Sequence, residues 1–128
     1  MNPTPKKILI VDDEEYVVDM IKLRLEEEGY EIQSAPDGSV AIKTAESFQP
    51  DLIIMDLMME GLTGTETIKI LKANKNTSII PVLVLTGKVS EEDKKEVLSA
   101  GAKDFITKPI LPARLLFQIK KMLPSDGE

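Results

Sequence analysis

Cysteine and histidine are both absent from this chain of 128 residues. Without cysteine there is no disulfide framework and no thiolate-bound metal, and without histidine there is no His-ligated zinc and no Ser-His-Asp triad. No apolar run approaches the roughly 20 residues that span a bilayer. The apolar run Ile8–Val11 is also too short for a signal peptide. We therefore expect a soluble, cytoplasmic protein with no membrane segment.

The residues that are present have the composition of one ordinary globular domain. Hydrophobic residues make up 42% and charged residues 30% of the chain, which is long enough to bury a single core without cross-links. The 16 basic residues are outnumbered by 22 acidic ones, for a net charge of −6. A surface of this sign disfavours direct binding to nucleic acid or to anionic membranes.

Five segments have the pattern of β-strands. Ile8–Val11, Leu52–Met55 and Ile79–Leu85 are apolar throughout, as strands covered on both faces of a parallel sheet usually are. Tyr30–Ala35 and Lys103–Thr107 are more mixed, which is typical of edge strands. Between and after these segments, apolar residues recur at helical spacing in Val17–Leu25, Ala41–Phe48, Ile68–Leu71, Val97–Ala100 and Leu111–Met122.

Strand and helix therefore alternate five times. Alternation of this kind predicts an α/β fold: a doubly wound, five-stranded parallel sheet with five helices on its two faces. We expect the flavodoxin-like strand order 2-1-3-4-5, with the order reversing between strands 1 and 3.

Polar residues follow four of the five predicted strands at the point where each strand ends. Asp12 and Asp13 follow the first, Asp56 the third, Thr86 the fourth and Lys108 the fifth. Ligands of open α/β sheets bind beyond the carboxyl ends of the strands, at the point where the strand order reverses. The sequence therefore predicts a polar site at this edge, with three aspartates beside the reversal.

Three carboxylates at one place repel one another, and two like charges ~4 Å apart cost about 4 kcal/mol at an effective dielectric constant of 20. A bound cation offsets this repulsion. Because only oxygen ligands are on offer, the favoured ion is a hard one such as Mg²⁺, which commonly takes a substrate phosphate as a further ligand. Lys108 and Thr86 then neutralise and hydrogen-bond phosphoryl oxygens, Asp56 is the candidate nucleophile, and Gly87 leaves room for the phosphoryl group.

Each of these residues also has a structural alternative. Asp12 or Asp13 caps the following helix, and Asp56 caps a loop turn. Thr86 is then a turn hydroxyl and Lys108 a solvated surface lysine. Four strand ends that deliver complementary groups to one edge favour the functional interpretation of the set.

Two further residues near the fifth strand carry alternatives of their own. Phe105 is either a core aromatic on an edge strand or a partly exposed switch residue. Pro109 predicts a constrained turn that aims Lys108, with a cis Lys108–Pro109 bond as one form of it.

Taken together, the motifs resemble the receiver domain of two-component response regulators. The resemblance runs from about Lys7 to Leu123, leaving residues 1–6 as an N-terminal tail and 124–128 as a C-terminal tail or the start of a linker. The motifs that carry it are Val11-Asp12-Asp13-Glu14, Leu52–Met55 closing on Asp56, Leu85-Thr86-Gly87, Gly101-Ala102 and Phe105-Ile106-Thr107-Lys108-Pro109.

The resemblance implies that Asp56 accepts a phosphoryl group from a histidine kinase or a histidine phosphotransfer protein. It implies Mg²⁺ at Asp13 and Asp56, with Asp12 acting through a bound water and the backbone carbonyl of Met58 as a ligand. It also implies that Thr86 engages the phosphoryl group.

In this family Lys108 is a second partner of the phosphoryl group, and Thr86 moves together with the aromatic at Phe105. That movement remodels the face formed by the fourth helix, fifth strand and fifth helix. A downstream protein target or an attached output domain then responds, and a homodimer through the same face is a further implied partner. The residues that tune phosphoryl lifetime are Met58 and Lys88.

Three positions depart from the common family pattern. Glu60 stands where proline is usual, although Gly64 keeps the loop length. Gly87 replaces the commoner alanine, and Phe105 lacks the hydroxyl of the frequent tyrosine.

Two rival functions stay open from the sequence. A haloacid-dehalogenase-like phosphatase shares the Asp nucleophile, hydroxyl, lysine and Mg²⁺, but needs a general acid at the position of Met58. A binding-only, receiver-like module would bind no Mg²⁺ and would not be phosphorylated.

Overall fold

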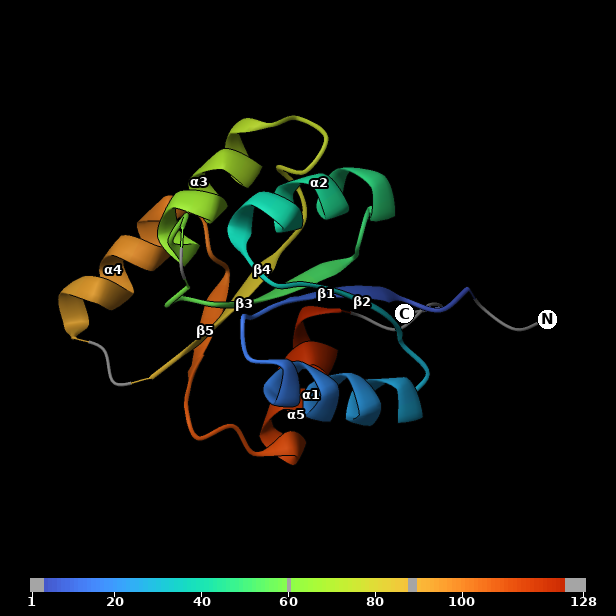
Figure 1. Cartoon of the computed structure of the whole chain (residues 1–128). Helices are drawn as coiled ribbons and strands as arrows, with labels where there is room; N and C mark the ends of the chain where they lie inside the picture. The colour runs from blue at the N-terminus through green and yellow to red at the C-terminus, as the bar shows by residue number, and fades with distance from the viewer. Residues whose placement is uncertain (1–3, 60, 88–89, 124–128) are drawn as a thin grey trace.

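The computed structural model of the chain describes residues 4–59, 61–87 and 90–123. In these residues five strands and five helices alternate (Figure 1). The strands are β1 (Lys7–Val11), β2 (Glu31–Ala35), β3 (Leu52–Asp56), β4 (Val82–Thr86) and β5 (Asp104–Thr107). The helices are α1 (Glu15–Glu27), α2 (Gly38–Phe48), α3 (Gly64–Ala73), α4 (Glu91–Ala100) and α5 (Pro112–Met122).

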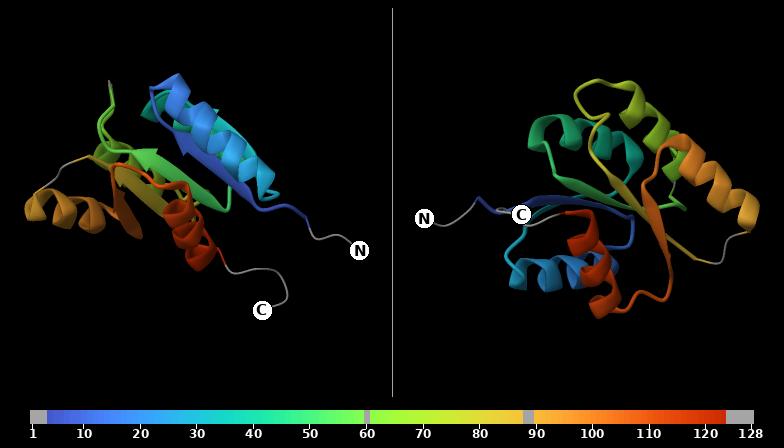
Figure 2. Two further views of the ribbon diagram at one scale, coloured as in Figure 1. Left: turned by 90° about the horizontal axis from the view of Figure 1, so that it is seen from below. Right: turned by 180° about the vertical axis from the view of Figure 1, so that it is seen from behind.

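The strands form one parallel sheet in the order β2-β1-β3-β4-β5, which confirms the expected topology. Helices α1 and α5 cover one face, and α2, α3 and α4 cover the other (Figures 1 and 2). The three-layer arrangement follows from right-handed crossovers that leave the central pair β1 and β3 in opposite directions along the sheet.

Two apolar cores lie on the two faces of the sheet, because successive side chains of a strand point to opposite sides. In β1, Leu9 packs in the core under α2, α3 and α4, and Ile8 packs in the core under α1 and α5. Residues on both faces of the central strands are buried in these cores, which is why β1, β3 and β4 are apolar except at Lys7, Asp56 and Thr86 at their ends.

The fourth strand begins three residues later than the sequence analysis predicted. Ile79 is 88% exposed and lies in the turn after α3, and β4 starts at Val82, directly after Pro81. The turn is held by the Lys72 ammonium, which donates to the backbone carbonyl oxygens of Ser78 (3.0 Å) and Ile80 (2.6 Å). These bonds hold the segment in a turn before the chain enters the sheet. The apolar run in the sequence is therefore longer than the strand.

Short polar residues cap α2 and α4 at their starts. Ser90 caps α4 in a reciprocal capping box with Asp93, and Asp37 caps α2 by accepting from the backbone N–H of Val40. The sequence analysis missed a second capping box, in which Thr63 and Glu66 begin α3. Its Thr-x-x-Glu spacing was the available signal.

No helix in the described part of the chain has both the length and the apolarity that crossing a bilayer requires.

We predict that Gly38→Ala destabilises the fold at the contact between α2 and α3. A Cβ at Gly38 would lie 2.1 Å from Oγ1 of Thr67, a buried hydroxyl that donates to the carbonyl of Thr63 at 2.8 Å. Overpacking of this kind costs about 1–3 kcal/mol in the free energy of unfolding, which urea titration measures. The neighbouring, exposed Ser39→Ala is the control. Equal midpoints for both variants would contradict the prediction.

Candidate functional site

Three aspartates lie together at the carboxyl edge of the sheet. One carboxylate oxygen from each of Asp12, Asp13 and Asp56 lies within 4.8 Å of the other two. The pairing of Val11 with Met55 across β1 and β3 brings the residues that follow them side by side. Asp12 and Asp56 are 4% and 5% exposed, whereas Asp13 is open to solvent. The cluster predicted from the strand ends therefore exists, with one acid on its outer side.

The two buried carboxylates have few partners. Asp12 accepts a hydrogen bond from the backbone N–H of Glu14 (2.9 Å) through Oδ1, and its buried Oδ2 has no hydrogen-bond partner among the described residues. Asp56 Oδ1 accepts from the backbone N–H of Met58 at 3.3 Å and lies 3.6 Å from Nζ of Lys108. Lys108 thus points at the cluster from the end of β5, as the sequence predicted.

The alternative in which Asp12 or Asp13 caps α1 is wrong. The N-cap of α1 is Glu14, and no side chain caps this helix. The turn interpretation of Asp56 is correct in part, because its carboxylate does accept the backbone N–H two residues ahead. That bond leaves Asp56 Oδ1 within reach of Lys108, so the two interpretations are compatible.

Burial raises the pKa of both inner carboxyls. For Asp12 the main cause is desolvation, which the hydrogen bond from Glu14 opposes and the charge of Asp56 adds to. For Asp56 desolvation again dominates, and the positive charge of Lys108 is the largest opposing cause. Two acids whose charged forms are disfavoured, beside a solvent-facing third, form a site that gains stability from a cation.

The donor set fits Mg²⁺. All the side-chain ligand atoms are carboxylate oxygens, and Oδ2 of Asp12 is a buried acceptor without a partner among the described residues. Asp13, on the solvent side, leaves a direction from which water or a phosphate oxygen can complete the coordination.

Thr86 closes β4 beside this cluster. Its side chain is buried, and its Oγ1 has no hydrogen-bond partner among the described residues. Its backbone carbonyl accepts from the N–H of Lys108 at 2.7 Å, which ties the ends of β4 and β5 together. The Lys108–Pro109 bond is cis, as the sequence analysis considered. A Cβ at Gly87 would meet no atom within 4 Å, so the space there is open.

Phe105 is half-buried on β5 and packs against the core under α4. The ammonium of Lys94, on α4, lies 5.3 Å from the centre of its ring. Phe105 therefore combines the two interpretations that the sequence left open: part of its ring is core, and part is accessible.

Two other residues of interest, Met58 and Gly64, lie in or beside the segment that joins β3 to α3. Met58 carries a side chain that is 76% exposed. A Cβ at Gly64 would lie 2.9 Å from Cα of Leu57 and 3.0 Å from the carbonyl oxygen of Asp56, so only glycine fits there. Glu60 and Lys88 lie outside the described residues, as do residues 1–3 and 124–128 of the expected tails.

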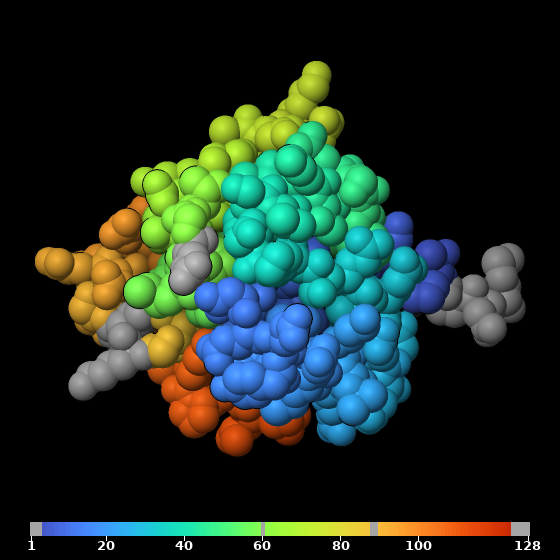
Figure 3. Space-filling view, viewed as in Figure 1, coloured from blue at the N-terminus to red at the C-terminus, as the bar shows by residue number. Residues whose placement is uncertain are grey.

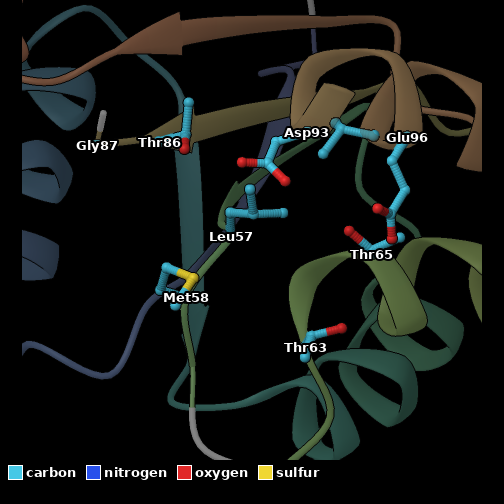
Figure 4. Close-up of a pocket in the computed structure, with 9 residues that line it drawn as sticks. Leu57, Met58, Thr63, Thr65, Thr86, Gly87, Asp93 and Glu96 are labelled. Carbon is cyan, nitrogen blue, oxygen red and sulfur yellow. The ribbon is translucent and has the colours of Figure 1, made fainter. Parts of the chain in front are cut away.

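A groove lies beside Thr86, between α4 and the first turn of α3 (Figure 4). The sequence analysis did not predict it. Asp93 and Glu96 of α4 and Thr65 of α3 line it. These residues come from segments that share no periodic or motif signal, so only the packing of the helices brings them together.

The profile of the response regulator receiver domain matches residues 8–120. The chain belongs to this family. It is 43% identical over 118 residues to the alkaline phosphatase synthesis transcriptional regulatory protein PhoP of Bacillus subtilis, covering 92% of this chain and 48% of that protein. It is 40% identical to the phosphate regulon transcriptional regulatory protein PhoB of Pseudomonas aeruginosa, covering 96% and 56%. The receiver domain thus spans about half the length of these relatives.

Solved structures agree with the assignment. The chemotaxis protein CheY4 of Vibrio cholerae superposes with a TM-score of 0.90 at 33% identity, covering 94% of this chain and all of that one. The receiver domain of the sensor histidine kinase PA1611 from Pseudomonas aeruginosa has a TM-score of 0.86 at 28% identity, covering 95% and 100%. That structure has a magnesium ion coordinated in its active-site cleft. The receiver domain described here is therefore a module of two-component signal transduction.

We predict that Asp12→Asn stabilises the metal-free receiver domain at neutral pH. A carboxyl whose folded pKa is raised contributes stability below its unfolded pKa, and this contribution is lost as pH rises through the folded pKa. The amide removes the buried charge and keeps an oxygen for the N–H of Glu14. A gain in the free energy of unfolding is expected at pH 7, because the wild type holds a desolvated charge there that the amide lacks.

Urea titrations in a chelator at pH 7 and at about pH 3.5, just below the ordinary Asp pKa, check this prediction. The gain should shrink at the lower pH. Asp19→Asn, on the exposed side of α1, is the control. A gain independent of pH, or one shared by the control, would show that the buried charge is not its cause.

Proposed function

We propose that this receiver domain is a phosphorylation-activated switch that accepts a phosphoryl group on Asp56. The donor is a sensor histidine kinase or a histidine phosphotransfer protein, and the reaction depends on Mg²⁺. The observation that carries the proposal is the position of Asp56: it lies within the three-carboxylate cluster, 3.6 Å from the Lys108 ammonium. A lone buried aspartate would have neither a cation site nor a positive charge to receive a phosphate.

Asp13 and Asp56 would hold Mg²⁺ directly, Asp12 through a bound water, and Met58 through its backbone carbonyl. When bound, the ion supplies positive charge that neutralises phosphoryl oxygens and the adjacent carboxylates. The support is the all-oxygen donor set and the unpartnered Oδ2 of Asp12.

In the transfer itself, a carboxylate oxygen of Asp56 forms a bond to phosphorus while the bond from phosphorus to the donor's imidazole nitrogen breaks. The Lys108 ammonium then lies close enough to a terminal phosphoryl oxygen to pair with it. The hydroxyl of Thr86, which has no hydrogen-bond partner among the described residues, would donate to another. Slow attack by water on the acyl phosphate restores Asp56. Positioning and electrostatics supply the catalysis, as is usual for phosphoryl transfer.

The output is a change of conformation. The new partners offered to Thr86 and Lys108 bias a two-state element formed by Thr86 and Phe105, and with it the face of α4, β5 and α5. Moving such an equilibrium from 1:99 to 99:1 takes about 5.5 kcal/mol, and two charge-assisted contacts at roughly 1.5–3 kcal/mol each approach that value. A downstream target, an attached output domain or a second copy would bind the changed face.

A protein donor has a suitable surface on α1. Tyr16, Met20 and Leu23 recur on one side of this helix and are 71%, 50% and 62% exposed. In the space-filling view α1 occupies the centre of the visible face (Figure 3). An apolar stripe of this kind next to the carboxylate cluster supports docking of a helical donor protein.

We assign the receiver unit to residues 7–123 and its place of action to the cytoplasm.

The decisive measurement is the intact mass of the protein after incubation with acetyl phosphate and Mg²⁺. We expect the wild type to gain one phosphoryl group, and Asp56→Asn to gain none because an amide oxygen is a poor nucleophile. Omitting Mg²⁺ should abolish the gain. An unmodified wild type would favour a binding-only module, and repeated turnover of a phosphate ester would favour a phosphatase.

The lifetime of the phosphorylated form gives a separate prediction. The thioether of Met58 cannot orient an attacking water, so we expect slow autodephosphorylation in excess Mg²⁺. Met58→Asn should speed the decay about tenfold, below the 10²–10⁴ of full acid–base catalysis. Met58→Leu, which is equally apolar, should leave it unchanged. Wild-type decay within seconds would refute this role of Met58.

A further inference from the structure

The groove between α3 and α4 is a cavity of about 520 Å³ that opens on the surface next to the phosphoacceptor site. Its inner end is formed by Thr86, and its sides are the first turn of α3 and the inward side of α4. Asp12, Asp13 and Asp56 do not line it among the described residues. The groove is therefore a separate feature that adjoins the carboxylate cluster through Thr86 and through Leu57 and Met58, the two residues after Asp56.

The lining combines an apolar floor with negative charge. Leu57 and Val97 supply aliphatic surface at the base, and the exposed side chain of Met58 extends this surface to the rim. The carboxylates of Asp93 and Glu96 point from α4 into the space between the helices (Figure 4). Among the described lining residues there is no basic side chain to neutralise them.

The two carboxylates differ in whether they already accept a hydrogen bond within the protein. Asp93 accepts the backbone N–H of Ser90 in the capping box of α4. Glu96 has no hydrogen bond or ion pair with any residue that the structure describes. A hydrogen-bond donor that enters the groove therefore lies beside the unpaired carboxylate of Glu96.

The inner end of the groove carries a polar residue that the proposed function also uses, Thr86. Thr86 is 2% exposed, and its hydroxyl oxygen has no partner among the described residues. A buried hydroxyl without a partner is uncommon in folded proteins, and its place at the base of a groove marks a position for a hydrogen-bonding ligand group.

We propose that this groove binds an arginine side chain from a basic segment of a partner protein. The aliphatic stem of arginine matches the floor formed by Leu57 and Val97, and its guanidinium matches the carboxylates and the inner hydroxyl. The cavity exceeds the size of one side chain, and exposed methionine at a rim adapts to neighbouring residues of a peptide. The net charge of −6 also favours a basic partner.

Binding in this groove is linked to the state of Thr86, because the same hydroxyl lies at its inner end. By reciprocity, a ligand that contacts this hydroxyl changes the equilibrium of any rearrangement that moves it. The binding itself requires neither Mg²⁺ nor phosphate, so it is testable independently of the proposed function.

The test is a titration of the ¹⁵N-labelled receiver domain, without Mg²⁺ or a phosphate donor, with the peptide acetyl-Leu-Arg-Leu-amide. Backbone amide shifts are followed by NMR. We expect saturable shifts centred on Thr65, Gly87 and Val97. The matched peptide with citrulline in place of arginine keeps the shape and removes the charge, and should bind at least tenfold more weakly.

Two variants identify the carboxylate. Glu96→Gln should weaken binding of the arginine peptide about threefold, within the range measured for one exposed charge pair. Glu92→Gln, on the same helix but not among the residues that line the groove, should leave the affinity unchanged. Both are exposed polar substitutions that preserve the fold.

Four outcomes would overturn the proposal. They are equal binding of the citrulline peptide, an unchanged affinity in Glu96→Gln, shifts centred on Asp13 and α1 instead of the groove, and equally tight binding of agmatine, which would indicate a small free cation. None of them bears on phosphorylation of Asp56, which the mass measurement tests alone.

Discussion

The main physical constraint in this molecule is the repulsion among buried carboxylates at the ends of two paired strands. The parallel register of β1 and β3 places Asp12 beside Asp56, and the apolar layers on both faces leave these acids little water. Burial of apolar side chains in the two cores thus offsets the cost of holding the carboxylates of Asp12 and Asp56 close together. Such an arrangement is stable only as part of a fold whose other contacts are strong, and it makes the site responsive to any added positive charge.

The positive charge of Lys108 offsets part of that repulsion. It reaches Asp56 from β5, two strands away in the sheet, and its backbone N–H is bonded to the carbonyl of Thr86. The cation that receiver domains bind would supply the remainder. Charge at the carboxylates is therefore coupled through short, direct contacts to the ends of β4 and β5.

Thr86 stands between two environments. On one side lie the carboxylates and Lys108, and on the other lies the groove walled by α3 and α4. Phe105 and Lys94 form a second contact between β5 and α4 nearby. The ends of β4 and β5 thus adjoin α4 directly, through the groove beside Thr86 and through the contact between Phe105 and Lys94.

The sequence alone determined the strand order, the two-sided burial of the central strands and the gathering of Asp12, Asp13, Asp56 and Lys108 at one edge of the sheet. It could do so because continuous apolar runs require cover on both faces, and because parallel strands bring their carboxyl ends to one edge. Tertiary structure decided the rest. The start of β4 depends on Lys72 reaching the carbonyls of the preceding turn, and the groove beside Thr86 depends on how α3 and α4 pack. Contacts of this kind join residues distant in the chain, so no local pattern encodes them.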